Sequence, residues 1–365
     1  MVTITTCVPD SCQNADQVLV KELINANAPS VQYMVFNQNM VLYHFQQGLA
    51  NIKDHEIVRD ETTFNAYSLT KTFTALAVLQ LVEQGKVDLE ASVSTYLPDC
   101  PYPAEITIKH LLTHTSGIAD PIPLSWVHLV EEDSTFNEKK FFKTVFEKNR
   151  TLKFKPGEKF KYSNLGYVLL GQVIAAVSGI SYEKYITQNI ISKLNLPPGA
   201  LGFQIYDTRN HATGYHKKWS FSNLLLSCFI NKSKFMGKAE NSWQPFKFLY
   251  VNGKAYGGLI GTTNGLVKYL QEFLKPETRL ISQANKRLLL TETKTANDKN
   301  TGMCLAWFTG ELNGTRYYTH AGGGGGFYLE MRIYPEKGIG SLIVFNRSGM
   351  SDERFLNQVD KFFVQ

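Results

Sequence analysis

The chain has 365 residues, a length that corresponds to one large or two ordinary domains. Hydrophobic residues make up 43% and charged residues 19%, which excludes an intrinsically disordered chain and suffices for an ordinary core. No apolar stretch approaches the roughly 18 residues of a bilayer-spanning helix, so no membrane span is predicted.

The formal net charge of +6 is concentrated in one segment. Residues 137–161 contain nine Lys or Arg and three Glu, a difference equal to the charge of the whole chain. The segment forms either an electropositive rim that attracts anions or the solvated face of a helix. The helical spacing of Phe141, Phe142, Val145 and Phe146 favours the solvated face. No basic-aromatic module accompanies it, which argues against nucleic-acid binding.

Five cysteines are present: Cys7, Cys12, Cys100, Cys228 and Cys304. Their spacing contains no paired metal-binding motif, and an odd number leaves at least one free thiol. Cys7 and Cys12 are close enough in sequence to suggest a local disulfide. The N-terminus has neither a basic start nor an apolar run, so no signal peptide is predicted. The location stays open between the cytoplasm and an exported form without its leader.

The predicted elements begin with a helix over 16–26 and two strands, 31–37 and 40–45, that a short turn joins. Residues 72–82 contain no charged side chain and are apolar on every side. This is typical of a helix buried in a domain core. A second strongly apolar helix is predicted over 165–177.

The second half of the chain has a different pattern. Residues 201–252 show weak periodicity and many polar breaks, which predicts a segment rich in loops. A helix follows at 265–274, and a last helix is predicted over 352–363. Between these two helices, short apolar runs predict antiparallel strands at 303–309, 316–320, 326–334 and 340–346.

This order predicts an α+β fold in which an antiparallel sheet is flanked by terminal helices and joined to an all-helical domain. Residues 1–66 and 297–365 would form the sheet domain, and residues 67–296 the mainly helical domain. We expect the active site to lie between them.

Ser68 and Lys71 form a Ser-x-x-Lys motif at the start of the buried helix. Residues at i and i+3 face the same way on a helix, so the amine can reach the hydroxyl. Burial disfavours the charged lysine, which makes it a proton acceptor near neutral pH. A second copy, Ser181 to Lys184, lies in a polar stretch beside Glu183, where the lysine would stay protonated. The first copy is therefore the candidate nucleophile and base.

Tyr162 and Asn164 form a Tyr-x-Asn motif in a turn before the second apolar helix. A phenol near a cation can shuttle protons, and an amide can bind a substrate amide. The same pattern recurs at Tyr250 to Asn252, so the motif is weak by itself.

His320 ends a predicted strand and opens a run of small residues that includes Gly322 and Gly323. Such a backbone can come close to a ligand, and its N–H groups on an edge strand can hold an oxyanion. The alternative is a flexible hairpin turn with an incidental histidine. The number of glycines exceeds what a turn needs and favours the ligand site.

In this order, Ser-x-x-Lys, Tyr-x-Asn and His-x-Gly resemble the motifs of the penicillin-recognising serine hydrolases. The resemblance is with the branch of class C β-lactamases, D,D-carboxypeptidases and β-lactamase-fold esterases, and it covers about residues 30–350. It implies a β-lactamase/transpeptidase-like fold. Supporting stretches run from Ile108 to Gly117, Lys155 to Gly157, Tyr256 to Leu259 and Tyr334 to Ser348.

The resemblance also implies a covalent acyl-enzyme. Ser68 would attack a carbonyl, with Lys71 and Tyr162 as the general base, and Tyr162 would then protonate the leaving group. The backbone N–H groups of Ser68 and Gly323 would form an oxyanion hole, and Asn164 would position the substrate amide. The implied partner is a small molecule, short peptide or ester, with no cofactor and no metal.

His320, followed by Gly322 and Gly323, would line the opposite wall. The β-lactamases of this branch carry lysine in place of His320, a permanent cation suited to a substrate carboxylate, whereas histidine is mostly neutral at pH 7. Glycine at 323 also lacks a hydroxyl that could bind a carboxylate. This departure favours D,D-carboxypeptidase, amidase or esterase activity over β-lactamase activity. The resemblance favours a periplasmic or other extracytoplasmic location.

The sequence argues against three alternatives. An α/β-hydrolase would need a Gly-x-Ser-x-Gly elbow, which the sequence lacks. His110 and His114 have the i, i+4 spacing of zinc ligands, but no glutamate lies between them. The third is a penicillin-binding sensor that acylates and stalls, or a scaffold without turnover. The presence of every motif residue favours an enzyme.

Overall fold

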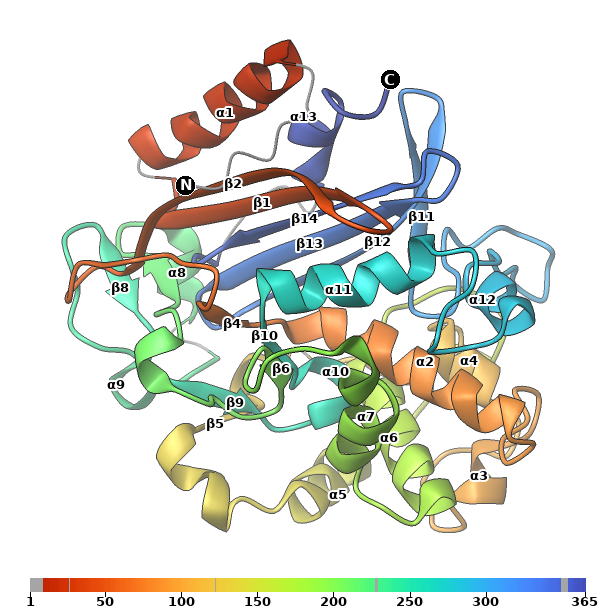
Figure 1. Cartoon of the computed structure of the whole chain (residues 1–365). Coiled ribbons are helices and arrows are strands. Elements are labelled where there is room, and N and C mark those ends of the chain that lie inside the picture. Colours follow the sequence, from red (N-terminus) through yellow and green to blue (C-terminus); the bar gives the residue numbers. More distant parts are fainter. Residues whose placement is uncertain (1–8, 26, 122, 227–228, 349–353) are drawn as a thin grey trace.

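The computed structural model describes residues 9–25, 27–121, 123–226, 229–348 and 354–365. Its central layer is an antiparallel sheet with the strand order β11-β12-β13-β14-β1-β2-β3 (Figure 1). The predicted antiparallel sheet is thus confirmed. Its strands are β1 (Ser30–Asn37), β2 (Val41–Asn51), β3 (Glu56–Ile57), β11 (Phe308–Leu312), β12 (Thr315–Gly324), β13 (Phe327–Tyr334) and β14 (Ile339–Phe345).

Strands from the two ends of the chain meet in the middle of the sheet. β1 pairs with β14, in a register that runs from Val31↔Phe345 to Asn37↔Ile339, and its other edge pairs with β2. Nearly every residue of β1 and every residue of β13 is buried, because helices cover both faces. The sheet therefore cannot form from either end of the chain alone.

The two faces of the sheet carry different helices (Figure 1). α1 (Pro9–Ile24) and α13 (Leu356–Asp360) cover one face, and α11 (Thr263–Leu274) packs on the other against β1 and β14. The last helix is shorter than the predicted 352–363. Phe362 and Phe363, which follow α13, still pack against the apolar cluster between the sheet, α1 and α13. Their apolar spacing in the sequence therefore indicates burial, which continues beyond the end of the helix.

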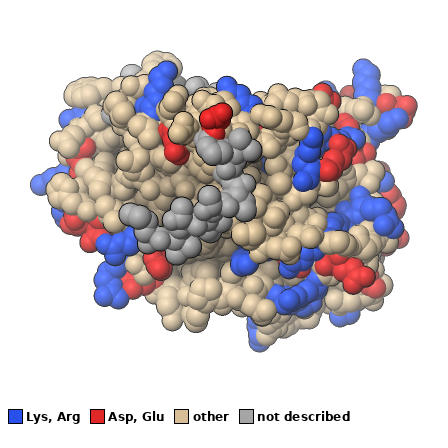
Figure 2. All heavy atoms as spheres, turned by 45° about the horizontal axis from the view of Figure 1, so that its top comes forward, with Lys and Arg blue, Asp and Glu red and all other residues tan. Residues whose placement is uncertain are grey.

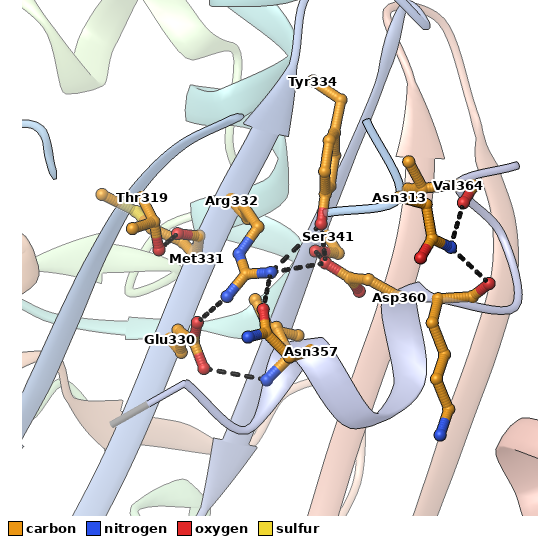
Figure 3. Close-up of polar contacts among 12 residues, drawn as sticks. Asn313, Thr319, Glu330, Met331, Arg332, Tyr334, Ser341, Asn357, Asp360 and Val364 are labelled. Carbon is orange, nitrogen blue, oxygen red and sulfur yellow. Dashed lines mark hydrogen bonds and ion pairs between the residues drawn. The ribbon is translucent and has the colours of Figure 1, made fainter. Parts of the chain in front are cut away.

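A buried network of polar and charged side chains holds α13 against the sheet (Figure 3). Arg332 of β13 pairs with Glu330 at 2.6 Å and donates a hydrogen bond to Asn357 at 2.7 Å. Arg332 also lies 3.8 Å from Asp360 of α13. Asp360 accepts hydrogen bonds at 2.7 Å from three hydroxyls, those of Tyr33, Tyr334 and Ser341.

α2 (Thr70–Glu83) is the central helix of the mainly helical part. Its side chains are buried from Thr70 to Leu81, as the uncharged sequence predicts. It packs against α6 (Asn164–Ser178) and α10 (Lys254–Gly257). The other helices are α3 (Val93–Tyr96), α4 (Ile108–Leu112), α5 (Glu138–Lys148), α7 (Tyr182–Asn189), α8 (Phe221–Leu226), α9 (Lys232–Phe235) and α12 (Gln283–Leu289).

Short strands lie among these helices, so this part is mainly rather than wholly helical. Within the described residues they form a three-stranded sheet, β4-β10-β6, and the pairs β5-β9 and β7-β8. Segment 201–252, predicted to be rich in loops, contains several of them, and strands of two or three residues are too short to show a period. The domain boundaries near residues 66 and 297 stay a prediction. The strands are β4 (Thr63–Asn65), β5 (Val127–Leu129), β6 (Leu201–Gly202), β7 (Tyr215–Lys217), β8 (Trp243–Pro245), β9 (Leu249–Val251) and β10 (Ile260–Thr262).

The basic segment 137–161 begins with α5, which buries Phe142 and Phe146 and exposes its lysines. This is the solvated helix face that the spacing predicts. Figure 2 brings the opposite side of the molecule, with α1, forward, and basic and acidic side chains are interspersed on that face.

Cys12 is disulfide-bonded, whereas Cys100 and Cys304 carry free thiols. The predicted Cys7–Cys12 bridge involves a residue outside the described part of the chain, as does any statement on Cys228. Across the described ranges, no single helix has both the length and the apolar character to cross a bilayer. The pair Asn164–Ser178 and Tyr182–Leu194 meets those criteria together, with a bend of 74° between its members.

Candidate active site

Ser68 lies in a short 3-10 turn, η1 (Tyr67–Leu69), directly before α2. Tyr67 has a φ of 46°, in the left-handed region that bulky side chains rarely adopt. Thr70 holds the turn, because its hydroxyl donates to the Tyr67 carbonyl at 2.6 Å and accepts the Leu259 N–H at 3.0 Å. Ser68 is thereby placed, half-buried, in the lining of a cavity of about 1040 Å³.

Lys71 reaches Ser68 from the first turn of α2. Its Nζ lies 3.1 Å from Ser68 Oγ and donates to the Tyr256 carbonyl at 2.7 Å. The side chain is fully buried, with the rings of Tyr162 and Tyr167 4.9 and 5.5 Å from Nζ. Burial lowers the pKa of Lys71 well below its usual value, and the nearby Asp120 carboxylate partly opposes this. The amine can therefore serve as a proton acceptor.

Tyr162 completes the group around the Ser68 hydroxyl. Its OH lies 3.0 Å from Ser68 Oγ. The Tyr162 ring stacks on His114, with ring centroids 4.3 Å apart, and lies parallel to Phe308 on another side. The structure thus brings Ser68, Lys71 and Tyr162 together, although 94 residues separate the first from the last.

Asn164 begins α6, where Ser163 is the N-cap residue. Its backbone N–H donates to Asp120 Oδ1 at 2.7 Å and its side-chain Nδ2 donates to Asp120 Oδ2 at 3.2 Å. Because the amide nitrogen is directed at this carboxylate, the amide oxygen points elsewhere and is available as an acceptor. Asn164 lines the cavity, and its role in substrate binding stays a prediction.

Two further residues belong to the site: Asp120, which the sequence did not single out, and His114, which it offered only as a possible zinc ligand and as part of the family-like stretch. Asp120 orients Asn164, and burial raises its pKa against the effects of the Asn164 N–H and Lys71. His114 supports Tyr162, and its Nδ1 accepts the N–H of Ser163 at 3.0 Å. The sequence holds a signal for both residues, because they lie within or just after the family-like stretch that starts at Ile108. Their roles could not be predicted from it, because Asp120 acts through Asn164 and His114 through Tyr162, each more than forty positions away.

His320 lies in β12 and is 1% exposed. Neither ring nitrogen has a hydrogen-bond partner among the described residues, and the ring is tilted against Phe308 at 5.5 Å. Burial, with the nearby Lys71, lowers the pKa of His320 to about 3. The imidazole is therefore neutral near pH 7.

The glycines after His320 allow η1, the turn that carries the candidate nucleophile Ser68 and is here called the nucleophile turn, to pack directly on β12. A Cβ at Gly322 would overlap the carbonyl oxygen of Ala66, and a Cβ at Gly325 would overlap the Tyr67 hydroxyl. β11, not β12, is the outer strand, which corrects the expected edge position. However, β11 pairs with β12 only up to Thr319, so residues 320–324 have no described strand on that side.

The second copies of Ser-x-x-Lys and Tyr-x-Asn, here called the decoy motifs, serve structural roles. Ser181 caps α7 and accepts the N–H of Lys184 at 3.3 Å. Asn252 lies 2.8 Å from the buried His128. His110 caps α4 while His114 faces Tyr162, so the two imidazoles do not converge. In the described part of the chain, no group of three or more His, Cys, Asp or Glu is placed to hold a metal.

A family model matches most of the chain. The Beta-lactamase model matches residues 15–364, and the chain belongs to this family, whose members are serine hydrolases. Protein flp of Staphylococcus aureus (strain NCTC 8325 / PS 47) is 26% identical over 92% of this chain and 63% of its own length. Penicillin-binding protein 4* of Bacillus subtilis (strain 168) is 26% identical over 80% of this chain, again 63% of its own length. The chain thus spans just under two thirds of these relatives.

Solved structures share the fold. The octameric penicillin-binding protein homologue from Pyrococcus abyssi superposes with a TM-score of 0.76 at 24% identity and covers 95% of this chain and 75% of its own. The D-amino acid amidase from Ochrobactrum anthropi SV3 gives 0.76 at 21% identity, with 96% and 99% covered. A class C β-lactamase gives 0.74 at 19% identity, with 97% and 96% covered.

Proposed function

We propose that this protein is a serine hydrolase that cleaves amide or ester bonds through a covalent acyl-enzyme on Ser68. One observation carries the proposal: the Ser68 hydroxyl lies 3.1 Å from the Lys71 amine and 3.0 Å from the Tyr162 hydroxyl, in the lining of the cavity. A serine beside two groups that transfer protons is the arrangement that nucleophilic catalysis requires.

Acylation begins when Ser68 Oγ attacks the substrate carbonyl carbon while its proton passes to the Lys71–Tyr162 pair. The new C–O bond places negative charge on the carbonyl oxygen. When the tetrahedral intermediate collapses, the bond to the leaving group breaks and the leaving atom takes a proton from Tyr162. Water then attacks the acyl-enzyme, gives a proton to the same pair, and the proton returns to Ser68 as the acid departs.

The developing oxyanion would be held by the backbone N–H groups of Ser68 and Gly323. The close approach of β12 to the nucleophile turn supports this assignment, because a Cβ at Gly322 would lie only 3.1 Å from the Ser68 nitrogen. The missing strand partner beyond Thr319 leaves that edge of β12 for a ligand. Asn164 would accept an N–H of the substrate through its amide oxygen.

The substrate would be a small molecule, a short peptide or an ester. The neutral, buried His320 supports peptidase, amidase or esterase activity over β-lactamase activity, because it offers no cation to a substrate carboxylate. The amidase and penicillin-binding protein among the similar proteins support the same range.

Intact-protein mass spectrometry over time, with penicillin and separately with a p-nitrophenyl ester, tests the proposal. We expect an adduct that forms and clears on the unmodified protein and is absent from Ser68→Ala. Ser181→Ala, which alters the decoy motif, should behave like the unmodified protein. An adduct that persists would indicate a penicillin-binding sensor instead, and full ester turnover by Ser68→Ala would refute the proposal.

A further inference from the structure

The cavity beside Ser68 is lined almost entirely by uncharged side chains. Among the described residues of the lining, Arg354 is the one Lys or Arg, and no Asp or Glu is present. Its volume of about 1040 Å³ is that of a site for a drug-sized ligand, far more than an acetyl group would fill.

One side of the cavity is a continuous apolar surface, here called the Leu249 wall. It consists of Val127, Ile230, Phe246 and Leu249, which pack in one cluster with Met236. Leu249 and Met236 are both 4% exposed, but Met236 is not part of the lining. The wall therefore offers apolar contact without a hydrogen-bonding side chain.

The Leu249 wall starts beside the nucleophile turn. A Cβ at Gly325 would lie 3.5 Å from Leu249 Cδ1 and would overlap the hydroxyl of Tyr67, so these two side chains meet at one point. Tyr67 directly precedes Ser68. A group bonded to Ser68 Oγ can thus extend along the wall within the same cavity.

The leaving group belongs on another side of Ser68. Tyr162, which would give it a proton, is surrounded by His114, Phe308 and His320 rather than by the Leu249 wall. A leaving atom must lie within hydrogen-bond reach of the Tyr162 hydroxyl to take that proton. The acyl part of the substrate is then the part that is left to face the Leu249 wall.

We propose that the Leu249 wall binds the acyl group of the substrate, and that this group is an uncharged aliphatic or aromatic chain of medium length. The inference rests on the proposed acyl-enzyme at Ser68. Each methylene that moves from water to an apolar wall strengthens binding about fourfold. A substrate with a longer apolar acyl chain should therefore be preferred until the cavity is full.

The test is kcat/KM for p-nitrophenyl acetate, butyrate, hexanoate and octanoate, which share one leaving group. We expect a rise of about threefold to fourfold per methylene from acetate to hexanoate. Leu249→Asn should lower the hexanoate-to-acetate ratio at least tenfold. Met236→Asn, equally buried in the same cluster but outside the lining, should leave that ratio unchanged.

Val127→Trp provides a second variant at a less buried position of the wall. It fills part of the cavity and should move the optimum to a shorter chain. Thermal unfolding of each variant shows whether it is folded before rates are compared.

A small fluorophosphonate separates the two proposals. Ser68 Oγ forms a bond to phosphorus, fluoride leaves, and the serine proton passes to the Lys71–Tyr162 pair. If Ser68 is labelled but kcat/KM does not change with the length of the acyl chain, the acyl-group inference alone is overturned. A length dependence that survives in both Leu249→Asn and Val127→Trp also overturns it. If Ser68 is not labelled and none of the esters is hydrolysed, the proposed function itself is overturned.

Discussion

Lys71 is the residue on which the proposed chemistry depends most directly. It is fully buried among aromatic rings, and its amine contacts the nucleophile and a backbone carbonyl rather than a carboxylate. Desolvation therefore keeps the neutral form accessible, which a surface lysine cannot achieve. The second Ser-x-x-Lys copy, at the exposed start of α7, lacks this environment.

Replacing Lys71 by Ala should lower kcat for p-nitrophenyl acetate by about a thousandfold, because general base catalysis typically contributes two to four orders of magnitude. Steady-state hydrolysis measures this directly. Lys184→Ala, the matched change in the decoy motif, should leave the rate within about twofold. Similar losses in both variants would contradict the assignment of the base.

Asp120→Asn should move the acid limb of the pH profile of kcat/KM to lower pH. The Asp120 carboxylate raises the pKa of Lys71, so its removal lowers that pKa further, and the neutral base persists to lower pH. Weaker hydrogen bonding to Asn164 should also reduce the rate at the pH optimum about tenfold, because Asn164 is then less well positioned. Asp133→Asn, a carboxylate that contacts His128 rather than the site, is the control. An acid limb that stays in place would show that Asp120 does not act on Lys71.

Most of the candidate site was predictable from local motifs, and the rest was not for a physical reason. Ser68 with Lys71, and Tyr162 with Asn164, each form a short pattern that is visible in sequence. Asp120 forms no pattern with its neighbours, and the spacing of His114 from His110 does not indicate its contact with Tyr162. Each acts through a residue more than forty positions away, and that proximity exists only in the folded chain.

At the scale of elements, β12 positions the site through its glycines. Gly322→Ala should destabilise the protein by about 2 kcal/mol, because the new methyl group overlaps the Ala66 carbonyl and the core is already packed. Activity should fall at least tenfold as the Ser68 turn is displaced. Urea unfolding and ester hydrolysis measure the two effects.

Gly202→Ala is the matched control, since a Cβ there meets nothing within 4 Å and Gly202 has no positive φ. Its stability and rate should stay close to those of the unmodified protein. If Gly322→Ala behaves in the same way, the close approach of β12 to the nucleophile turn is not required.

Elements were predictable where one pattern persists over many residues. The helix predicted at 165–177 is α6, and the strand predicted at 326–334 is β13, each within a residue of its observed bounds. The run 303–309 was wrong as a strand, because 303–307 is a fully buried irregular segment and β11 starts at Phe308. There the apolar run reported burial rather than extended structure.

At the scale of the whole molecule, the C-terminal helix depends on one buried arginine. Arg332→Met should lower the free energy of unfolding by about 3–5 kcal/mol, because it leaves Glu330 and Asp360 buried without their partner. Arg316→Met is the control. It breaks a partly exposed pair with Glu292 and should cost less than about 1 kcal/mol. Urea unfolding of both variants decides whether burial sets the difference.

The pairing of β1 with β14 also determines the order in which the protein can mature. During synthesis β1 and β2 leave the ribosome long before β14, and β1 lacks this central neighbour until β14 has been made. Such long-range pairing slows folding and leaves apolar strand edges open to chaperones in the meantime. His320 is brought beside Ser68 by the same late strands. The candidate site around Ser68 is therefore incomplete until β12, β13 and β14 have been made.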